Sequence, residues 1–449
     1  MKQAAALASV LCFALLAATA PLPAPADPDQ NWPQWRGPRM TGVAPQGNPP
    51  VEWSDSKNIK WKIEIPGKGS ASPIVWGDRI FVLTAIPTEK KVPAAAAPEP
   101  AAPGKRGRGP RGIQPDAVQQ FAVIAVNRKD GKILWQKVVR EELPHEGTHP
   151  TGTWASNSAV TDGEHVYAFF GSRGLYALDM NGNLKWEKDF GDMTIRLGFG
   201  EGASPAVHGD KIVVTWDHEG DSFIVALDKR SGKEAWRVPR DEGTAWTTPL
   251  IVEANGATQV ITSATRKVRS YDLATGKLLW ETAGMTANAI PTPVTDGKIV
   301  YLTSGFRGNA LMAVNLDAAK GNLASTEAVL WKFDRDTPYV PSPLLYDGKL
   351  YFMKTNSAIV SCFDAATGKP LYGPERIEGM TDVYASPVGA SGRVYVFGRD
   401  GVGTVLAHGP EFKVLAQSKL DDGFDASPAI VGNEMYIRGR NHLYRISAD

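Results

Sequence analysis

The sequence predicts an all-β fold, an eight-bladed β-propeller of four-stranded antiparallel blades. The first observation behind this prediction is a Ser or Thr that opens a short apolar run and recurs eight times, followed by Pro in every copy but one. These anchors are Ser72, Ser158, Ser204, Thr248, Thr292, Ser342, Ser386 and Ser427. After the first interval, which is longer, they are 41–50 residues apart. Periods of about 40–50 residues are typical of propeller blades.

The second observation is the pattern inside one repeat, residues 204–238. Short apolar or β-branched runs alternate there with turns such as Gly-Asp and Asp-Lys-x-Ser-Gly-Lys, which indicates four short strands in an up-and-down sheet. The last run ends in a Trp, and the same aromatic recurs at Trp135, Trp186, Trp236, Trp280 and Trp331. We expect these tryptophans to pack neighbouring blades together, because one large aromatic recurs at one position of the repeat.

The third observation concerns the two ends of the repeat region. The last repeat has room for only its first strands before Asp449, whereas residues 60–65 resemble a closing strand with its own Trp61 and precede the first anchor. We therefore expect the N-terminal strand to complete blade eight and close the ring, which removes open sheet edges. In blades six and seven, Tyr372 and Leu415 stand near the place of the closing Trp.

Residues 1–26 have the pattern of a secretory signal peptide: Lys2, an apolar run over residues 4–16, and Ala24-Pro-Ala26 as the cleavage site. An uncleaved anchor is the alternative. Cys12 lies inside the apolar run, which argues against a lipoprotein anchor. No later stretch approaches about 18 apolar residues, so we expect no membrane span after cleavage. The mature protein is expected to be a monomer, periplasmic or secreted.

The remaining chain divides into a leader packed on the propeller, residues 27–57, and the propeller itself, residues 58–449. An Ala/Pro/Arg-rich insertion at 87–118 is expected to be disordered, because its composition cannot bury a core. It contains the basic run 105–111, which either contacts an anionic surface or, as we favour, is a solvated loop. The formal net charge of +1 gives no reason to expect nucleic acid as a partner.

Motifs for catalysis or metal binding are weak. His145-Glu-Gly-Thr-His149 matches the H-E-x-x-H zinc-protease pattern, but Pro144, Gly147 and Pro150 predict a loop, whereas that chemistry needs a helix. The polar hairpin around Asp217 and Asp221 offers too few ligands to hold a cation by itself. Cys362, left alone after signal cleavage, is expected to be an inert buried thiol. We therefore assign no catalytic residue and no metal ligand.

Superposing the repeats gives a stronger prediction, a ligand funnel on one face of the ring. The hairpin after the second strand carries a cation in six blades: Arg173, Arg266, Arg307, Lys354, Arg399 and Arg440. The connections between blades add further polar and aromatic candidates to the same face: His149, Trp154, Asn157, Trp246, Tyr339, Tyr384 and Asp425. Such a funnel suits an anionic or polyhydroxylated small ligand. The alternative is that each cation pairs with a local acid.

The repeats resemble the pyrroloquinoline-quinone (PQQ) type repeat, which combines Ser-Pro-x-Val with Ala-Leu-Asp-x-x-Thr-Gly-Lys-x-x-Trp. The best copies are residues 224–236, 268–280 and 359–372. The resemblance covers about residues 58–449, and the leader Trp-Pro-Gln-Trp-Arg-Gly-Pro at 32–38 is similar to that of a group of exported bacterial propellers in this superfamily. The repeat is specific for fold and weak for function.

The resemblance implies two functions. One branch, the propeller of the outer-membrane β-barrel assembly machinery, is non-catalytic, and implies an exported binding or scaffold protein with an unknown protein partner. The other branch, the quinoprotein dehydrogenases, binds PQQ and calcium and oxidises alcohols or sugars. In that alternative the arginines would hold the quinone carboxylates, and Asp425 or Asp382 would be the base. The adjacent cysteines of the alcohol-oxidising members are missing here, so we favour the first branch and assign no cofactor.

Overall fold

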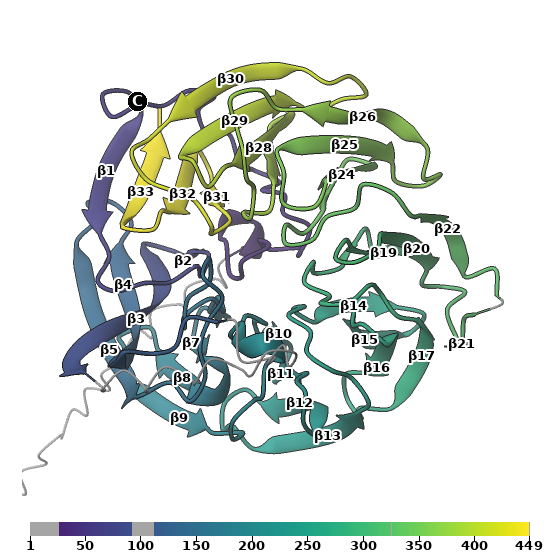
Figure 1. The fold of residues 1–449 in the computed structure, drawn as a ribbon, viewed down its shortest axis with the longest axis horizontal. Helices are drawn as coiled ribbons and strands as arrows, with labels where there is room; N and C mark the ends of the chain where they lie inside the picture. The colour runs from purple at the N-terminus through teal and green to yellow at the C-terminus, as the bar shows by residue number, and fades with distance from the viewer. Residues whose placement is uncertain (1–26, 92–111, 325, 449) are drawn as a thin grey trace, which may run out of the picture.

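The computed structural model describes residues 27–91, 112–324 and 326–448 of the chain. Eight sheets stand around a central axis (Figure 1), so the predicted all-β eight-bladed propeller is confirmed. The predicted signal peptide and basic run lie outside the described residues. Within the described ranges, no helix is long and apolar enough to cross a membrane.

Each blade is given from its inner strand to its outer strand. Blades one to four are β2 (Ile74–Trp76), β3 (Arg79–Lys91), β4 (Ala117–Asn127) and β5 (Ile133–Glu142); β6 (Val160–Thr161), β7 (His165–Phe169), β8 (Leu175–Asp179) and β9 (Leu184–Lys188); β10 (Ala206–His208), β11 (Lys211–Trp216), β12 (Ser222–Asp228) and β13 (Glu234–Arg240); β14 (Leu250–Ala254), β15 (Ala257–Thr262), β16 (Lys267–Asp272) and β17 (Leu278–Ala283).

Blades five to eight follow in the same order. They are β18 (Val294–Thr295), β19 (Ile299–Ser304), β20 (Ala310–Asn315) and β22 (Val329–Phe333); β23 (Leu344–Tyr346), β24 (Lys349–Met353), β25 (Ile359–Asp364) and β26 (Pro370–Arg376); β27 (Val388–Ala390), β28 (Arg393–Phe397), β29 (Val402–Ala407) and β30 (Val414–Lys419); β31 (Ala429–Val431), β32 (Glu434–Arg438), β33 (His442–Ser447) and β1 (Ile59–Glu64). β21 (Gly321–Asn322) adds a fifth, parallel strand to blade four. The described residues also form three short 3-10 helices, Pro28–Gln30, Gly171–Arg173 and Arg196–Gly198.

The N-terminal strand closes the ring as expected. β1 pairs antiparallel with β33, and the two lie side by side in Figure 1 although they come from opposite ends of the chain. The insertion in blade one falls between the second and third strands, but its expected bounds differ from the structure. Residues 87–91 belong to β3 and residues 117–118 to β4, while residues 92–111 lie outside the described part.

Burial explains why the middle strands read as continuous apolar runs. β11 is buried along nearly its whole length because neighbouring blades cover both faces of the sheet, whereas the outer strand β1 alternates between half-buried and exposed. The closing aromatics join one blade to the next. The indole N–H of Trp186, for example, donates to the carbonyl of Lys229 in the following blade over 3.0 Å.

The Asp-Lys-x-Ser-Gly-Lys turn fits against that same tryptophan. The Asp228 carboxylate accepts the backbone N–H of Ser231 over 2.8 Å, and Gly232 adopts a φ of 69°. A Cβ on Gly232 would come within 2.7 Å of the Trp186 ring. Glycine is therefore needed both for the positive φ and for the close approach. Tyr372 occupies the position of the closing Trp in blade six, and in blade seven Ala416 occupies it, next to the expected Leu415.

The leader crosses the ring on the side of the turns between first and second strands. Asn31 accepts the N–H of Gly77 over 2.8 Å, and the N–H of Asn48 donates to the carbonyl of Gly432 over 2.8 Å. Between these contacts the chain passes the middle of the ring, where the purple segment lies in Figure 1. The leader therefore forms hydrogen bonds with both blade one and blade eight and crosses the centre of the ring between them.

Candidate functional site

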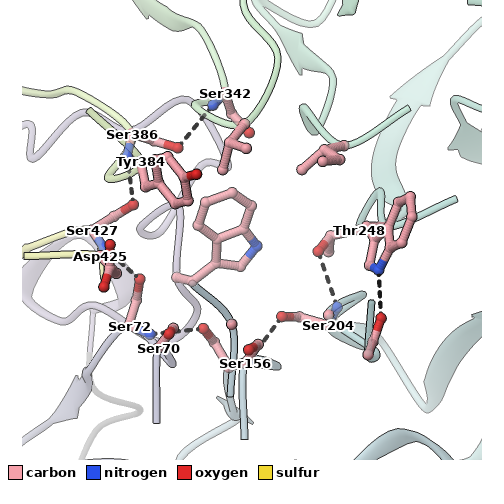
Figure 2. Close-up of a pocket in the computed structure, with 18 of the residues that line it drawn as sticks. Ser70, Ser72, Ser156, Ser204, Thr248, Ser342, Tyr384, Ser386, Asp425 and Ser427 are labelled. Atoms are coloured by element: carbon pink, nitrogen blue, oxygen red, sulfur yellow. Dashed lines mark hydrogen bonds between the residues drawn. The ribbon is translucent and has the colours of Figure 1, made fainter. Parts of the chain in front are cut away.

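The eight sequence anchors meet in a closed ring of hydrogen bonds. The backbone N–H of each anchor donates to the side-chain hydroxyl of the next, and the N–H of Ser427 donates to Ser72 across the junction of the chain ends. The eight distances are 2.9–3.2 Å, and every member is buried. Figure 2 shows six of these residues around the pocket. The sequence repeat predicted the positions of the eight anchors. It did not indicate the closed ring of hydrogen bonds that joins them in the structure.

A cavity of about 270 Å³ occupies the space inside this ring. Its wall contains aromatic side chains from the connections between blades, and the leader contributes Trp35. The residues predicted for the funnel that line it are His149, Trp246, Tyr339, Tyr384 and Asp425. Figure 2 shows Tyr384 and Asp425 next to Ser386 and Ser427. Sequence reasoning assigned no site role to Trp35, because a single-copy segment gives no repeat to compare.

Arg36 holds the leader in this place. Its guanidinium is fully buried and donates to the carbonyls of Pro387 over 3.0 Å, Pro343 over 2.7 Å and Thr41 over 3.3 Å. Pro343 and Pro387 directly follow ring members, so the leader is bonded to the residues that carry the ring. Trp35, the neighbour of Arg36, is the leader residue that lines the cavity.

The predicted cations do not form a uniform basic ring. Arg173 is buried beside Glu142, Asp192 and His145, away from the central cavity. Lys354 pairs with Asp336 over 2.8 Å. Arg307 has a φ of 53° and lies over the ring of Phe306 at 5.4 Å.

Arg266 lies in a separate groove near Glu242. Its side chain has no protein partner in the described chain.

Trp154 and Asn157 serve local structure: the Trp154 indole donates to the carbonyl of Glu146 over 3.1 Å, and the Asn157 amide donates to the carbonyl of Ala203 over 2.5 Å.

Arg399 and Arg440 meet at Asp425 on the cavity wall. The Nε of Arg399 donates to one carboxylate oxygen over 2.5 Å, and the Nε of Arg440 donates to the other over 3.2 Å. The Arg399 guanidinium lies over the ring of Tyr384 at 4.3 Å. Three of the predicted residues are thus joined to a cavity-lining tyrosine in one cluster.

His149 is held as a neutral imidazole beside this cluster. Its Nδ1 lies 2.7 Å from the hydroxyl oxygen of Thr151 and 3.1 Å from the backbone nitrogen of the same residue. Burial, together with the charge of Arg399, lowers the pKa of His149 below its usual range. The Nε2 atom of His149 has no hydrogen-bond partner among the described residues.

The two histidines of the H-E-x-x-H motif point to different partners. The motif lies in a loop, as expected, and its two histidines make different contacts: His145 Nε2 is 2.7 Å from the carbonyl oxygen of Met193, whereas His149 bonds to Thr151. Asp217, the other cation candidate, forms a bidentate pair with Arg240 at 2.7 and 2.9 Å. His145 Nε2 and both carboxylate oxygens of Asp217 are thus in contact with other protein groups.

A third group with metal-ligand residue types lies on a turn of blade two. Asp162, Glu164 and His165 have ligand atoms within 4.8 Å of one another. However, Asp162 pairs with Lys229 over 2.7 Å and Glu164 with Arg230 over 3.2 Å. The two carboxylates are therefore neutralised by cations from the next blade.

The cavity carboxylates are also occupied. Both oxygens of Glu201 accept hydrogen bonds from Ser172, at 2.6 Å from the backbone N–H and 2.5 Å from the hydroxyl, and burial raises its pKa. Both oxygens of Asp425 accept from arginines. Calcium takes six to eight oxygen ligands, including carboxylates. A calcium-bound quinone cofactor would therefore have to share the oxygens of Glu201 and Asp425 with Ser172, Arg399 and Arg440.

Fold and site together define a class: an eight-bladed propeller of PQQ-like repeats with a central cavity. The family model described as outer membrane protein assembly factor BamB matches residues 43–220 and 220–449, and the chain belongs to that family. This match confirms the resemblance inferred from the repeats. No curated protein matches the sequence.

Solved structures of similar fold come from both branches. BamB from Moraxella catarrhalis is 14% identical, with a TM-score of 0.56 over 86% of this chain and 99% of that chain. A europium-containing methanol dehydrogenase is 12% identical, with a TM-score of 0.60 over 93% and 98%. Quinohemoprotein alcohol dehydrogenase from Comamonas testosteroni is 11% identical, with a TM-score of 0.62 over 94% and 81%. At these identities the likeness shows the fold alone.

Proposed function

We propose that the protein is an exported, non-catalytic binding propeller whose central cavity holds a small polyhydroxylated ligand of about the size of a hexose. One observation carries this proposal: the cavity combines aromatic faces, among them Trp35 of the leader, with the side chains of seven of the eight ring residues. Aromatic walls with a few placed polar groups are typical of small-molecule sites. Each ring hydroxyl accepts one bond from the protein and keeps its own proton for another partner.

The choice of binding over catalysis is supported by the state of the ionisable groups. The carboxylates of Glu201 and Asp425 accept protein hydrogen bonds at both oxygens, and Nδ1 of His149 contacts Thr151. These hydrogen bonds hold the side chains in fixed positions, which suits the positioning of a ligand.

The test is calorimetric titration of residues 27–449 with glucose, followed by melting curves at saturating sugar. A ligand at about 100 times its dissociation constant stabilises the fold by about 2.7 kcal/mol. Tyr339→Ala, which removes a cavity wall, should abolish the heat of binding. The matched control is Tyr372→Ala on the outer strand of blade six, which should leave binding intact.

Two results would argue against this function. Binding of glucose that survives Tyr339→Ala would place the ligand elsewhere. A melting shift with calcium and PQQ, but not with glucose, would favour the dehydrogenase alternative, which would then be assayed with alcohols and sugars and an artificial electron acceptor.

The family description favours a second candidate, a scaffold in outer-membrane protein assembly. Family membership is the observation behind it. Affinity capture from detergent-solubilised envelopes should then recover components of the assembly machinery with the full chain and with a variant lacking residues 92–111. Recovery only with the full chain would assign the contact to the insertion. Recovery with neither chain would exclude a stable scaffold complex.

A further inference from the structure

Arg399 and Arg440 use only part of their hydrogen-bonding capacity. Each guanidinium contacts Asp425 through Nε alone, at 2.5 and 3.2 Å. No described residue accepts a hydrogen bond from the Nη atoms of either side chain. A guanidinium has five N–H donors in a planar fork, and four of the five are on the Nη atoms. The pair therefore keeps unused donors next to Asp425 and Tyr384, which line the central cavity, although neither arginine is itself among the lining residues.

The protein fixes both arginines in position. The Arg399 side chain is 18% exposed and stacks on Tyr384, and its backbone N–H donates to the carbonyl of Asp382 over 2.8 Å. The loop that carries Arg440 is organised by the buried carboxylate of Asp422, which accepts the backbone N–H of Arg440 over 2.9 Å and the hydroxyl of Tyr444 over 3.2 Å. The Arg440 side chain itself remains 47% exposed.

Asp425 is shared by two cations. The guanidinium groups of Arg399 and Arg440 both contact its single carboxylate. The carboxylate of Asp400, the residue after Arg399, instead accepts the N–H and the hydroxyl of Thr381 at 2.9 and 3.1 Å. Arg173 contrasts with this arrangement, because one guanidinium there faces two acids.

We propose that Arg399 and Arg440 form an anion clamp, in which Asp425 holds the two guanidinium groups and their Nη atoms bind an oxyanion of the cavity ligand. The oxyanion is a carboxylate or a phosphate, since both match the planar donor fork of arginine. This inference rests on the proposed function, because the rest of the ligand is the polyhydroxylated body in the cavity. It narrows that ligand to a hexose-sized sugar acid or sugar phosphate.

The experiment compares glucose, glucuronate and glucose 6-phosphate by calorimetric titration, since these probes differ only at carbon 6. The acid or the phosphate should bind about tenfold or more tightly than glucose, as expected for charge-assisted hydrogen bonds. Arg399→Gln and Arg440→Gln should each remove this preference. Arg266→Gln is the matched control, an arginine without a side-chain partner in a different groove, and should keep it.

Inorganic phosphate as a fourth probe separates the clamp from the cavity. Glucose, glucuronate and glucose 6-phosphate binding equally well would overturn the clamp and leave the proposed function standing. Phosphate binding that is lost in Arg440→Gln, with no binding of glucose, would support the clamp and overturn the polyhydroxylated ligand. No binding of any of the four probes would overturn both. Melting curves confirm that each variant is folded before it is titrated.

Discussion

Two regions of the cavity differ in how regular they are. We call the ring of eight hydrogen-bonded anchors its floor, and the cluster of Arg399, Arg440 and Asp425 its rim. In the floor, eight equivalent residues make eight equivalent bonds, all buried. The cations of the repeats behave differently from blade to blade: Lys354 has its own acid, Arg399 and Arg440 share one next to the cavity, and the Arg266 side chain, in a separate groove, has none among the described residues. The repeat thus fixes the scaffold, and chemical selectivity arises where the repeats differ. Stability should reside in the floor and ligand discrimination in the rim.

The largest effect on stability is expected at Arg36, which bonds the leader to the residues that follow two ring members. Arg36→Met should lower the free energy of unfolding by about 3 kcal/mol, because three buried carbonyls lose a charged donor. The burial that lowers the pKa of Arg36 to about 9 shows how completely this cation is removed from water. Urea denaturation gives the measurement.

A matched control lies three residues further along the leader. Arg39→Met removes a surface arginine whose partner is Asp29, and such pairs contribute about 0–1 kcal/mol. Equal losses for Arg36→Met and Arg39→Met would mean that the leader does not stabilise the ring through its centre.

A smaller effect is expected for one member of the ring. Ser204→Ala leaves the buried N–H of Ser158 without an acceptor and should cost about 1–3 kcal/mol in chemical denaturation. Ser204→Thr keeps the hydroxyl and should cost little, because Thr248 and Thr292 occupy equivalent positions. If both variants lose the same stability, side-chain packing rather than the hydrogen bond is responsible.

Regular features of the molecule could be predicted from the sequence, and single-copy features could not. The anchors, the closing tryptophans and the completion of blade eight by the N-terminal strand all follow from comparing repeats. The partners of the cations depend on contacts between neighbouring blades: Asp425 lies 26 residues beyond Arg399 and belongs to the next connection. No repeat indicates which cations face an acid. The place of Trp35 in the cavity also could not be predicted, because residues from several blades of the closed ring form that cavity.

The pH dependence of stability tests the surroundings of His149, which lies beside the Arg399 cluster. Because the pKa of His149 is lowered in the folded state, the unfolded chain binds its proton first as the pH falls below about 6.5. The folded state should therefore lose stability from His149 with falling pH until the folded imidazole is itself protonated. His149→Gln should reduce the loss measured between pH 7 and pH 5. His208→Gln, at a surface histidine, should change it less. A titration of His149 by NMR above pH 6.5 would contradict the expectation.

The smallest effect on stability is expected for Arg440→Gln, and this substitution tests most directly whether the floor carries stability and the rim carries recognition. Arg440→Gln should change the free energy of unfolding by less than about 0.5 kcal/mol, because the side chain is half exposed and its loop is organised by backbone bonds to Asp422. The same substitution should remove the preference for anionic sugars. A variant that is stable but unselective would show that the rim carries recognition without carrying the fold. A large loss of stability would instead make the Arg440–Asp425 contact part of the scaffold, and the division between floor and rim would fail at blade eight.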